Sequence, residues 1–306
     1  MAEPRVSVGI PVYNGESYLD EAIRSVQAQT LGDLEILVSD NGSTDASADI
    51  AARYAAEDPR IHLVRQPENR GAAWNYNELL RMARAPLFKW MPADDRMAPQ
   101  HLEHCVAALD AAPGAVLAYP QTELIDAEGR IVCTYADGLA LLEREPWRRA
   151  AHFVRVINLC NAVLGVFRSD VLRGTRQIQS FAGADAVLLL EIALRGPIVE
   201  VPELLFQRRI HAGASHEANR SRAELERWFD PRRARRFRLP VRYELLAGYL
   251  RAAREAPLPA GSRLLAAGAI LGAWSYRQTR VRLGRWRRQL RGERPAGKSG
   301  RWSGIG

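Results

Sequence analysis

Hydrophobic and polar positions alternate along the first hundred residues in a pattern that predicts short strands separated by helices. Apolar runs of four or five residues recur, and between them apolar side chains repeat every three or four positions, as on one face of a helix. The order is typical of βαβ units around a parallel sheet. The predicted strands are Val6–Ile10, stopped by Pro11, then Leu34–Val38, Ile61–Val64 and Leu87–Met91, and the predicted helices are Glu16–Gln29, Ala46–Ala56 and Ala72–Ala83.

The second half of the chain is less regular. Helices are predicted at Pro99–Ala111 and Ala184–Leu194, and strands at Ala115–Tyr119, Ile131–Tyr135, Ala162–Phe167 and Ile198–Ile210, the last interrupted by Pro202. After about residue 226 the pattern changes to Arg-rich helical segments broken by prolines. We therefore expect an α/β domain over residues 1–226, with a mostly parallel sheet flanked by helices, and a basic helical extension over residues 227–306.

Charge is spread unevenly over the 306 residues, whose formal net charge is +8. Residues 227–306 contain 20 Lys and Arg against 4 Asp and Glu, a balance of +16, so residues 1–226 hold 23 against 31, a balance of −8. An acidic body with a basic tail suggests an anionic partner for the tail, either a membrane or a nucleic acid.

The segment Leu264–Tyr276 favours the membrane. It is apolar but too short to span a bilayer, and it precedes arginines interleaved with Trp286. That composition is typical of a helix lying in a membrane interface. The alternative is a packed appendage whose arginines are merely solvated. Because the N-terminus lacks a signal-peptide layout, we expect a cytoplasmic protein, at the inner face of the cell membrane. The three cysteines show no CxxC spacing and are expected to be small buried hydrophobes.

Two adjacent carboxylates, Asp94 and Asp95, follow the predicted strand at Leu87–Met91. Ligands of parallel sheets bind beyond the carboxyl ends of the strands, which would bring this pair close to Tyr13–Gly15 and Asp40–Gly42. A divalent cation such as Mg²⁺ or Mn²⁺ takes one or two protein carboxylates and completes its shell with phosphate oxygens and water. The alternative is that both aspartates only cap the helix that starts near Pro99.

Several motifs, in order along the chain, decide between these two interpretations. They are Val6-Ser-Val-Gly-Ile-Pro-Val-Tyr-Asn-Gly15, Glu35-Ile-Leu-Val-Ser-Asp-Asn-Gly-Ser-Thr-Asp45, Asn69-Arg-Gly71 and Ala93-Asp-Asp95. Together they resemble the family 2 glycosyltransferases, which have the GT-A fold. The resemblance is colinear over the first hundred residues, looser to residue 215 and absent from the tail.

The resemblance implies a nucleoside-diphosphate sugar donor bound over the sheet with Mn²⁺ or Mg²⁺. Pro11, Tyr13 and Glu16 would line the nucleoside pocket, Asp40 would contact the base and Asp94 the ribose. Asp95 would be the metal ligand that bridges to the diphosphate, where the metal neutralises charge on the leaving group. The chain departs from the family pattern at Asn41, where a second carboxylate is common, and at Gln207–His211, which lacks the Q-x-x-R-W of processive synthases.

Inverting transfer also requires a general base for the acceptor hydroxyl. The family places a carboxylate at the start of a helix in the second half, which corresponds here to Asp185, with Glu191 as the weaker candidate. The alternative for Asp185 is a helix charge favoured by the dipole. The loop that begins Arg208-Arg209-Ile-His211 and ends at Ser215 resembles the family's Arg-x-His-x-x-x-Ser. His211 could therefore ligate the metal, and Arg209 could pair with a phosphate.

Two other classes of function compete with an inverting, non-processive transferase. A sugar nucleotidyltransferase would need a basic, Gly-rich loop after the first strand, and residues 11–15 contain no basic residue. A nucleic-acid-binding protein would leave Asp40 and Asp95 unexplained, so no nucleic acid is expected as a partner. The acceptor expected from the membrane-like tail is a lipid-linked or cell-envelope saccharide.

Overall fold

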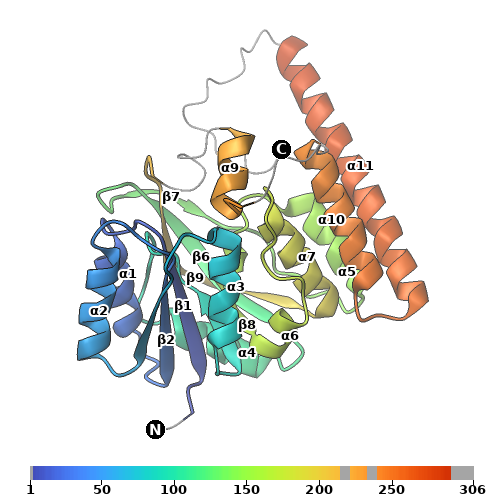
Figure 1. Cartoon of the computed structure of the whole chain (residues 1–306). Coiled ribbons are helices and arrows are strands. Elements are labelled where there is room, and N and C mark those ends of the chain that lie inside the picture. Colours follow the sequence, from blue (N-terminus) through green and yellow to red (C-terminus); the bar gives the residue numbers. More distant parts are fainter. Residues whose placement is uncertain (1–2, 214–220, 233–239, 291–306) are drawn as a thin grey trace.

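The computed structural model describes residues 3–213, 221–232 and 240–290, in which helices surround a curled mixed sheet (Figure 1). Within these residues the sheet has nine strands in the order β3-β2-β1-β4-β8-β6-β9-β5, with β7 paired to β6. The strands are β1 (Val6–Val12), β2 (Leu34–Asp40), β3 (Ile61–Arg65), β4 (Leu87–Trp90), β5 (Arg96–Met97), β6 (Leu117–Ile125), β7 (Ile131–Tyr135), β8 (Val166–Arg168) and β9 (Ile198–Arg209).

Parallel pairing is confined to two parts of the sheet. Strands β3, β2, β1 and β4 are parallel to one another, and β6 is parallel to β9. The other pairings, β4 with β8, β6 with β7 and β8, and β5 with β9, are antiparallel. The sheet is thus mixed, and its parallel half is the part that the sequence predicted.

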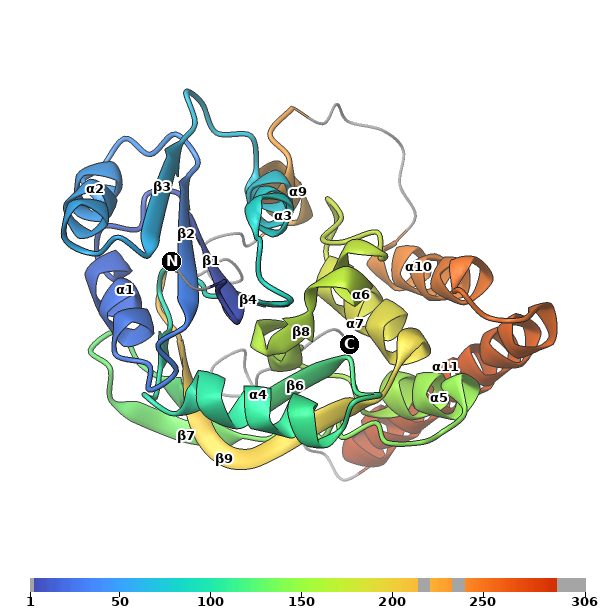
Figure 2. The ribbon, with the colours of Figure 1, turned by 90° about the horizontal axis from the view of Figure 1, so that it is seen from below.

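Helices cover the parallel half on both faces. Helices α1 (Leu19–Gln27) and α2 (Ser47–Glu57) lie on one face of strands β1 to β3, and α3 (Ala72–Met82) lies on the other (Figure 2). Helix α4 (His101–Ala111) packs under β6 and β9. Strands β1, β2 and β4 are buried on both faces, as expected for parallel strands between helix layers, whereas the edge strand β3 is partly exposed.

The sequence predicted that Pro11 ends the first strand. That prediction is wrong, because β1 continues to Val12. The carbonyl of Gly9 accepts the N–H of Met91, which directly follows β4. Because backbone groups alternate along a strand, the nitrogen of Pro11, two positions on, is also on the edge of β1 that faces β4. Strand β4 pairs only with residues 6–9, so no ladder bond is lost where Pro11 lacks its N–H.

The strand predicted at Ala162–Phe167 is also corrected. Cys160 has a left-handed backbone with φ of 60°, and a 3-10 turn, η1, follows at Asn161–Leu164 before β8. Gly165 between them lies so close to β6 that a Cβ there would be 2.5 Å from the carbonyl oxygen of Ala118. The expected break at Pro202 is a bulge, since Pro120 pairs with Val201 and Gln121 with Leu204.

The C-terminal helices belong to the same hydrophobic core as the domain. Helices α5 (Pro146–Val156) and α7 (Ala184–Arg195) pack against α10 (Val241–Glu255) and α11 (Ala260–Leu290), beside the short α6 (Ser169–Arg173). Tyr249 of α10 and Ile270 of α11 are fully buried in that core. The extension predicted over residues 227–306 is therefore helical and packed where the structure describes it, and residues 291–306 lie outside the described part.

Helix α9 (Arg222–Phe229) runs across the predicted boundary at residue 226 and covers the start of α3. Gly71 has φ of 90°, and a Cβ there would be 2.3 Å from the carbonyl oxygen of Phe229. Of the three cysteines, Cys105 and Cys160 are buried as predicted, but Cys133 on β7 is exposed. Within the described residues, no helix is both long enough and apolar enough to cross a membrane.

Candidate functional site

Loops at the carboxyl ends of β1 and β2 form one side of the candidate site. Asn14, in a left-handed conformation, accepts a bond of 2.8 Å from the N–H of Thr44. Glu16 accepts a bond of 2.9 Å from the N–H of Ala46, at the start of α2. The side chain of Tyr13 is 47% exposed. The structure therefore brings Tyr13, Glu16 and the loop after Asp40 together, as the sequence predicted.

Asp40 is buried at the end of β2, where its Oδ1 accepts a bond of 3.1 Å from the N–H of Ser43. The neighbouring Asn41 explains why this chain departs from the family pattern. Its Nδ2 donates to Oδ1 of Asn69 at 3.0 Å, while its Oδ1 accepts the N–H of Arg70 at 3.1 Å. A carboxylate could not donate the first bond. The amide thus ties β2 to the Asn69–Gly71 motif.

Asp94 and Asp95 occupy the turn between β4 and β5, and each contacts the end of β9. Oδ1 of Asp95 accepts a bond of 2.8 Å from the N–H of Arg209, and Oδ2 of Asp94 lies 3.0 Å from Nε2 of His211. Burial, followed by the charge of Asp94, raises the pKa of the Asp95 carboxyl well above its usual value. A buried carboxyl next to a second carboxylate is stabilised in its ionised form by a cation.

The donor set fits a hard divalent cation that is shared with a ligand. Among the described residues, no three His, Cys, Asp or Glu side chains form a complete metal cage. Mg²⁺ and Mn²⁺ do not need one where phosphate oxygens complete the shell. Asp95 and His211 are the residues that would hold such an ion, next to Asp94, and the capping alternative is unsupported because Gln100 occupies the N-cap of α4.

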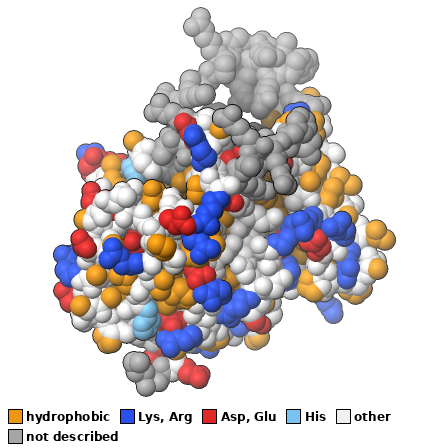
Figure 3. Space-filling model, in the orientation of Figure 1, with side chains coloured by type: hydrophobic (Ala, Val, Ile, Leu, Met, Phe, Trp, Pro, Cys, Tyr) orange, Lys and Arg blue, Asp and Glu red, His pale blue; other side chains and the backbone are white. Residues whose placement is uncertain are grey.

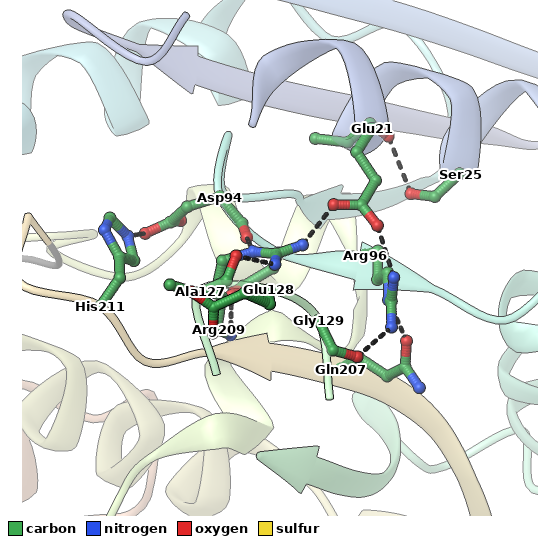
Figure 4. A network of polar contacts seen from close by, with 12 residues as sticks. Glu21, Ser25, Asp94, Arg96, Ala127, Glu128, Gly129, Gln207, Arg209 and His211 are labelled. Atoms are coloured by element: carbon green, nitrogen blue, oxygen red, sulfur yellow. Dashed lines mark hydrogen bonds and ion pairs between the residues drawn. The ribbon is translucent and has the colours of Figure 1, made fainter. Parts of the chain in front are cut away.

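Arg209 is almost fully buried and donates to protein acceptors (Figure 4). Its guanidinium contacts the carbonyl oxygens of Asp94, Asp126 and Ala127 and the carboxylate of Glu21. It also stacks 4.4 Å from the centroid of the Tyr18 ring. These contacts fix the Asp94–Asp95 turn against α1. Phosphate pairing by Arg209 stays a prediction, and it would require the side chain to exchange one of these contacts.

Asp185 lies in the first turn of α7, after Gly183, as the sequence predicted. Its Oδ1 accepts the N–H of Ala186 at 2.8 Å. Burial, and then the charges of Asp94 and Asp95, raise the pKa of the Tyr76 hydroxyl, to which Asp185 also contributes. The charges of Asp94, Asp95 and Asp185 therefore all act on one tyrosine side chain. The alternative base, Glu191, is buried on α7 in an ion pair with Arg176.

Arg208, Asn161 and Asp137, to which the sequence analysis assigned no role, form one hydrogen-bonded chain. Nη1 of Arg208 donates to Oδ1 of Asn161 at 2.7 Å, and the N–H of Asn161 donates to Oδ1 of Asp137 at 3.1 Å. Burial raises the pKa of Asp137 to about 7, and its Oδ2 lacks a hydrogen-bond partner among the described residues. Burial is the larger effect on the pKa of both Asp95 and Asp137, and the charge of Arg208 partly opposes it at each carboxyl. Since Arg208 adjoins Arg209 on β9, strand alternation could have placed it on the opposite face.

Lys89 is fully buried behind the turn, on β4. Its ammonium group donates to the carbonyl oxygen of Leu164 and lies 4.6 Å from the centroid of the Phe206 ring. Burial lowers the pKa of Lys89 to about 7, whereas the charges of Cys105 and Asp95 oppose that shift. Lys89 thus places a basic group inside the core, where its charge interacts with that of Asp95.

Comparison with known proteins identifies the class. Residues 7–132 match the model of glycosyl transferase family 2. The chain is 36% identical over 124 residues to an uncharacterized glycosyltransferase of Rickettsia typhi, covering 40% of this chain and 38% of the relative. It is also 36% identical over 101 residues to a putative teichuronic acid biosynthesis glycosyltransferase of Bacillus subtilis, covering 33% and 40%. The matched segments therefore span well under half of these relatives.

Two solved structures share the fold. TarS of S. aureus (residues 1–349) in complex with UDP-GlcNAc superposes with a TM-score of 0.60 at 16% identity, covering 90% of this chain and 74% of that one. A mannosyltransferase of Pyrobaculum calidifontis in complex with GDP-Man and Mn²⁺ gives 0.52 at 20% identity, covering 91% and 83%. Residues 7–132 of the chain thus match glycosyl transferase family 2, and the chain shares the GT-A type of fold with these two structures.

Proposed function

We propose that the protein is an inverting, metal-dependent glycosyltransferase that moves one sugar from a nucleoside-diphosphate sugar to a hydroxyl acceptor. The observation that carries this proposal is the pair of carboxylates in the turn after β4, where Asp95 accepts the N–H of Arg209 and Asp94 contacts His211. Asp95 and His211 suit a divalent cation, and Asp185, in the first turn of α7, is the third carboxylate of the proposal. The relatives with glycosyltransferase names and the fold neighbours with bound sugar nucleotides support the same activity.

The nucleoside half of the donor lies over the carboxyl ends of β1 and β2. Pro11, Tyr13 and Glu16 line its pocket, Asp40 contacts the base, and Asp94 contacts the ribose. The diphosphate faces Asp95 and His211, which would hold the divalent cation, Mn²⁺ or Mg²⁺. When bound, that cation neutralises charge on the departing diphosphate.

Asp185 accepts the proton of the acceptor hydroxyl as its oxygen attacks the anomeric carbon. The bond between that carbon and the diphosphate oxygen breaks, and its electron pair leaves with the diphosphate. A single displacement on the face opposite the leaving group inverts the anomeric configuration. Such base catalysis typically contributes about 10²–10⁴-fold to the rate.

The acceptor is a lipid-linked or cell-envelope saccharide, and the enzyme works on the cytoplasmic side of the cell membrane. Support comes from the basic C-terminal helices and from the relative whose name concerns teichuronic acid biosynthesis. Transfer is non-processive, because Gln207–His211 lacks the tryptophan of the processive motif.

Nucleotide binding tests the core of this proposal. We expect a nucleoside diphosphate to raise the melting temperature of the protein only when Mn²⁺ or Mg²⁺ is present, because a ligand that binds the folded state stabilises it. A screen of UDP, GDP, CDP and dTDP with and without each cation identifies the base. The proposal fails if none of these nucleotides shifts the transition, or if the shift is the same without a cation.

A further inference from the structure

The outer face of α11 is exposed and carries no charge over four turns. The pattern of exposure places its residues on one side of the helix, at the spacing of three and four that defines a helix face. The side chain of Leu264 is 75% exposed, and those of Leu265 and Tyr276 are 59% and 56% exposed. The outer face consists of Leu264, Leu265, Gly268, Leu271, Gly272, Ser275, Tyr276 and Thr279.

The opposite face of the same helix is fixed to the body of the protein. Ala266, Ile270 and Ala273 are almost fully buried where α11 packs on α5 and α10. A Cβ at Gly268 or Gly272 would meet nothing within 4 Å. The outer face is therefore a rigid apolar surface, and nothing in the described residues covers it. An exposed apolar patch of this size at the surface of a soluble domain marks an interaction site.

Exposed arginines flank this apolar face. Arg263 precedes it and Arg280 follows it, and the sequence of α11 contains no Asp or Glu. The guanidinium of Arg155, from α5, lies 5.9 Å from the centroid of the Tyr276 ring. Hydrophobic and basic side chains lie next to one another over α10 and α11 in Figure 3. An uncharged face with a basic rim is the composition of a helix that lies in a membrane interface.

We propose that the outer face of α11 docks on an anionic lipid bilayer, with its leucines below the headgroups and the arginines of its rim against lipid phosphates. Pairing of two copies through this face would bring two basic helices together, with no Asp or Glu on either α11. The occupant that fits the charge is therefore the membrane. This surface deepens the membrane location of the proposed function and rests on it for the identity of the acceptor.

The geometry also relates the surface to the site. Helix α7, which begins beside Asp185, packs on α10, and α10 packs on α11. A bilayer at the outer face would thus be separated from the predicted base by this helical layer alone. An acceptor anchored in the same bilayer would approach from that side of the molecule.

Vesicle co-sedimentation of the full-length protein tests the surface. The vesicles are phosphatidylcholine mixed with phosphatidylglycerol, and phosphatidylcholine alone. We expect the protein to pellet with the anionic vesicles, to stay in solution with the neutral ones, and to be released from the anionic ones as salt is raised. The double variant Leu264→Glu/Leu271→Glu should lose at least tenfold in vesicle partition.

A matched control carries the same two changes elsewhere. Ile131 and Val132 on β7 are 58% and 57% exposed, so Ile131→Glu/Val132→Glu adds equal charge at comparable exposure, and it should pellet like the wild type. Loss of pelleting in both double variants would overturn the proposal, as would pelleting of the α11 variant like the wild type. Wild-type protein that stays in solution with anionic vesicles would also overturn it.

A thermal-shift measurement and light scattering distinguish membrane docking from loss of folding, from loss of nucleotide binding and from dimer formation. Each variant should keep the nucleotide-dependent thermal shift, because Leu264 and Leu271 lie away from the candidate site; if the α11 variant loses it, the milder pair Leu264→Ser/Leu271→Ser takes its place. If the wild type shows no nucleotide-dependent thermal shift, that result counts against the proposed transferase activity and not against membrane docking by the outer face of α11. Light scattering that shows a dimer dissociated by the α11 variant, without vesicle binding, would identify a second copy as the occupant and overturn the proposal.

Discussion

Nε2 of His211 lies 3.0 Å from Oδ2 of Asp94. The contact joins the end of β9 to the turn after β4, and the edge of the Tyr18 ring packs on the imidazole, with the two ring centroids 4.8 Å apart. The imidazole is therefore oriented by two neighbours before any ligand arrives. Ser215, the last residue of the motif that contains His211, lies outside the described residues.

His211→Ala should weaken cation-dependent nucleotide binding about 10–100-fold, the usual cost of losing a group that holds or orients a metal site. The measurement is isothermal titration of the nucleoside diphosphate at fixed Mn²⁺. His104→Ala is the control, since His104 is exposed and pairs with Glu203 away from the site. An unchanged affinity in His211→Ala would leave the histidine with a packing role alone.

Asp95→Asn should abolish transfer and the Mn²⁺ dependence of nucleotide binding while the protein stays folded. The amide oxygen can still accept the N–H of Arg209, so the turn keeps its tether, but a neutral side chain is a poor ligand for a hard cation. Titration with and without Mn²⁺ measures the effect, and circular dichroism checks the fold. A variant that binds nucleotide in the same Mn²⁺-dependent way as the wild type would remove Asp95 from the metal site.

Asp185→Asn should lower turnover about 10²–10⁴-fold with little change in donor affinity, because the amide keeps the shape but cannot accept a proton. Glu191→Gln is the informative comparison on the same helix. It breaks a buried ion pair with Arg176, so it should lower stability by about 3–5 kcal/mol rather than turnover per folded molecule. If Asp185→Asn changes turnover less than a few-fold, Asp185 is not the base and Glu191 becomes the candidate.

Lys89→Met should stabilise the protein most at low pH. The pKa of Lys89 is lowered from 10.5 to about 7 on folding, so the unfolded state binds more protons between these values, and wild-type stability rises with pH across that window. Below pH 7 the full penalty applies, up to about 5 kcal/mol from the size of the shift. Urea unfolding at pH 6 and pH 9 should show the advantage of the variant shrinking at the higher pH. Equal differences at the two pH values would contradict a lysine that loses its proton on folding.

The parallel half of the fold was predictable because β1, β2 and β4 are buried on both faces and the loops carry distinctive turn residues. Strand β2 and helix α3 were located within two residues of their ends. The second half was less predictable because its pairing is set by distant contacts. Helix α5, with only a narrow apolar face, was missed, and so was β5, whose two residues form a strand only because β9 lies beside them.

The candidate site divides in the same way. Asp95 and Asp185 could be found because each stands at the end of a predicted element. Asp137 and Asn161 could not be found, because their hydrogen bond depends on the left-handed turn at Cys160, which no local sequence pattern predicts. Arg209 shows the limit of motif transfer, since a motif gives the residue but not the acceptors that surround its guanidinium.

The core shared with the C-terminal helices has a consequence for synthesis. Tyr249, Ile270 and Ala273 help to seal the core around α5 and α7, so that core cannot close until residues up to about 273 have left the ribosome. Strands β1 to β4 pair within the first ninety residues and can form far earlier. Domains generally fold as units during translation. In this chain the apolar surfaces of α5 and α7 therefore stay uncovered until α10 and α11 emerge, and the nascent protein is exposed to aggregation until then.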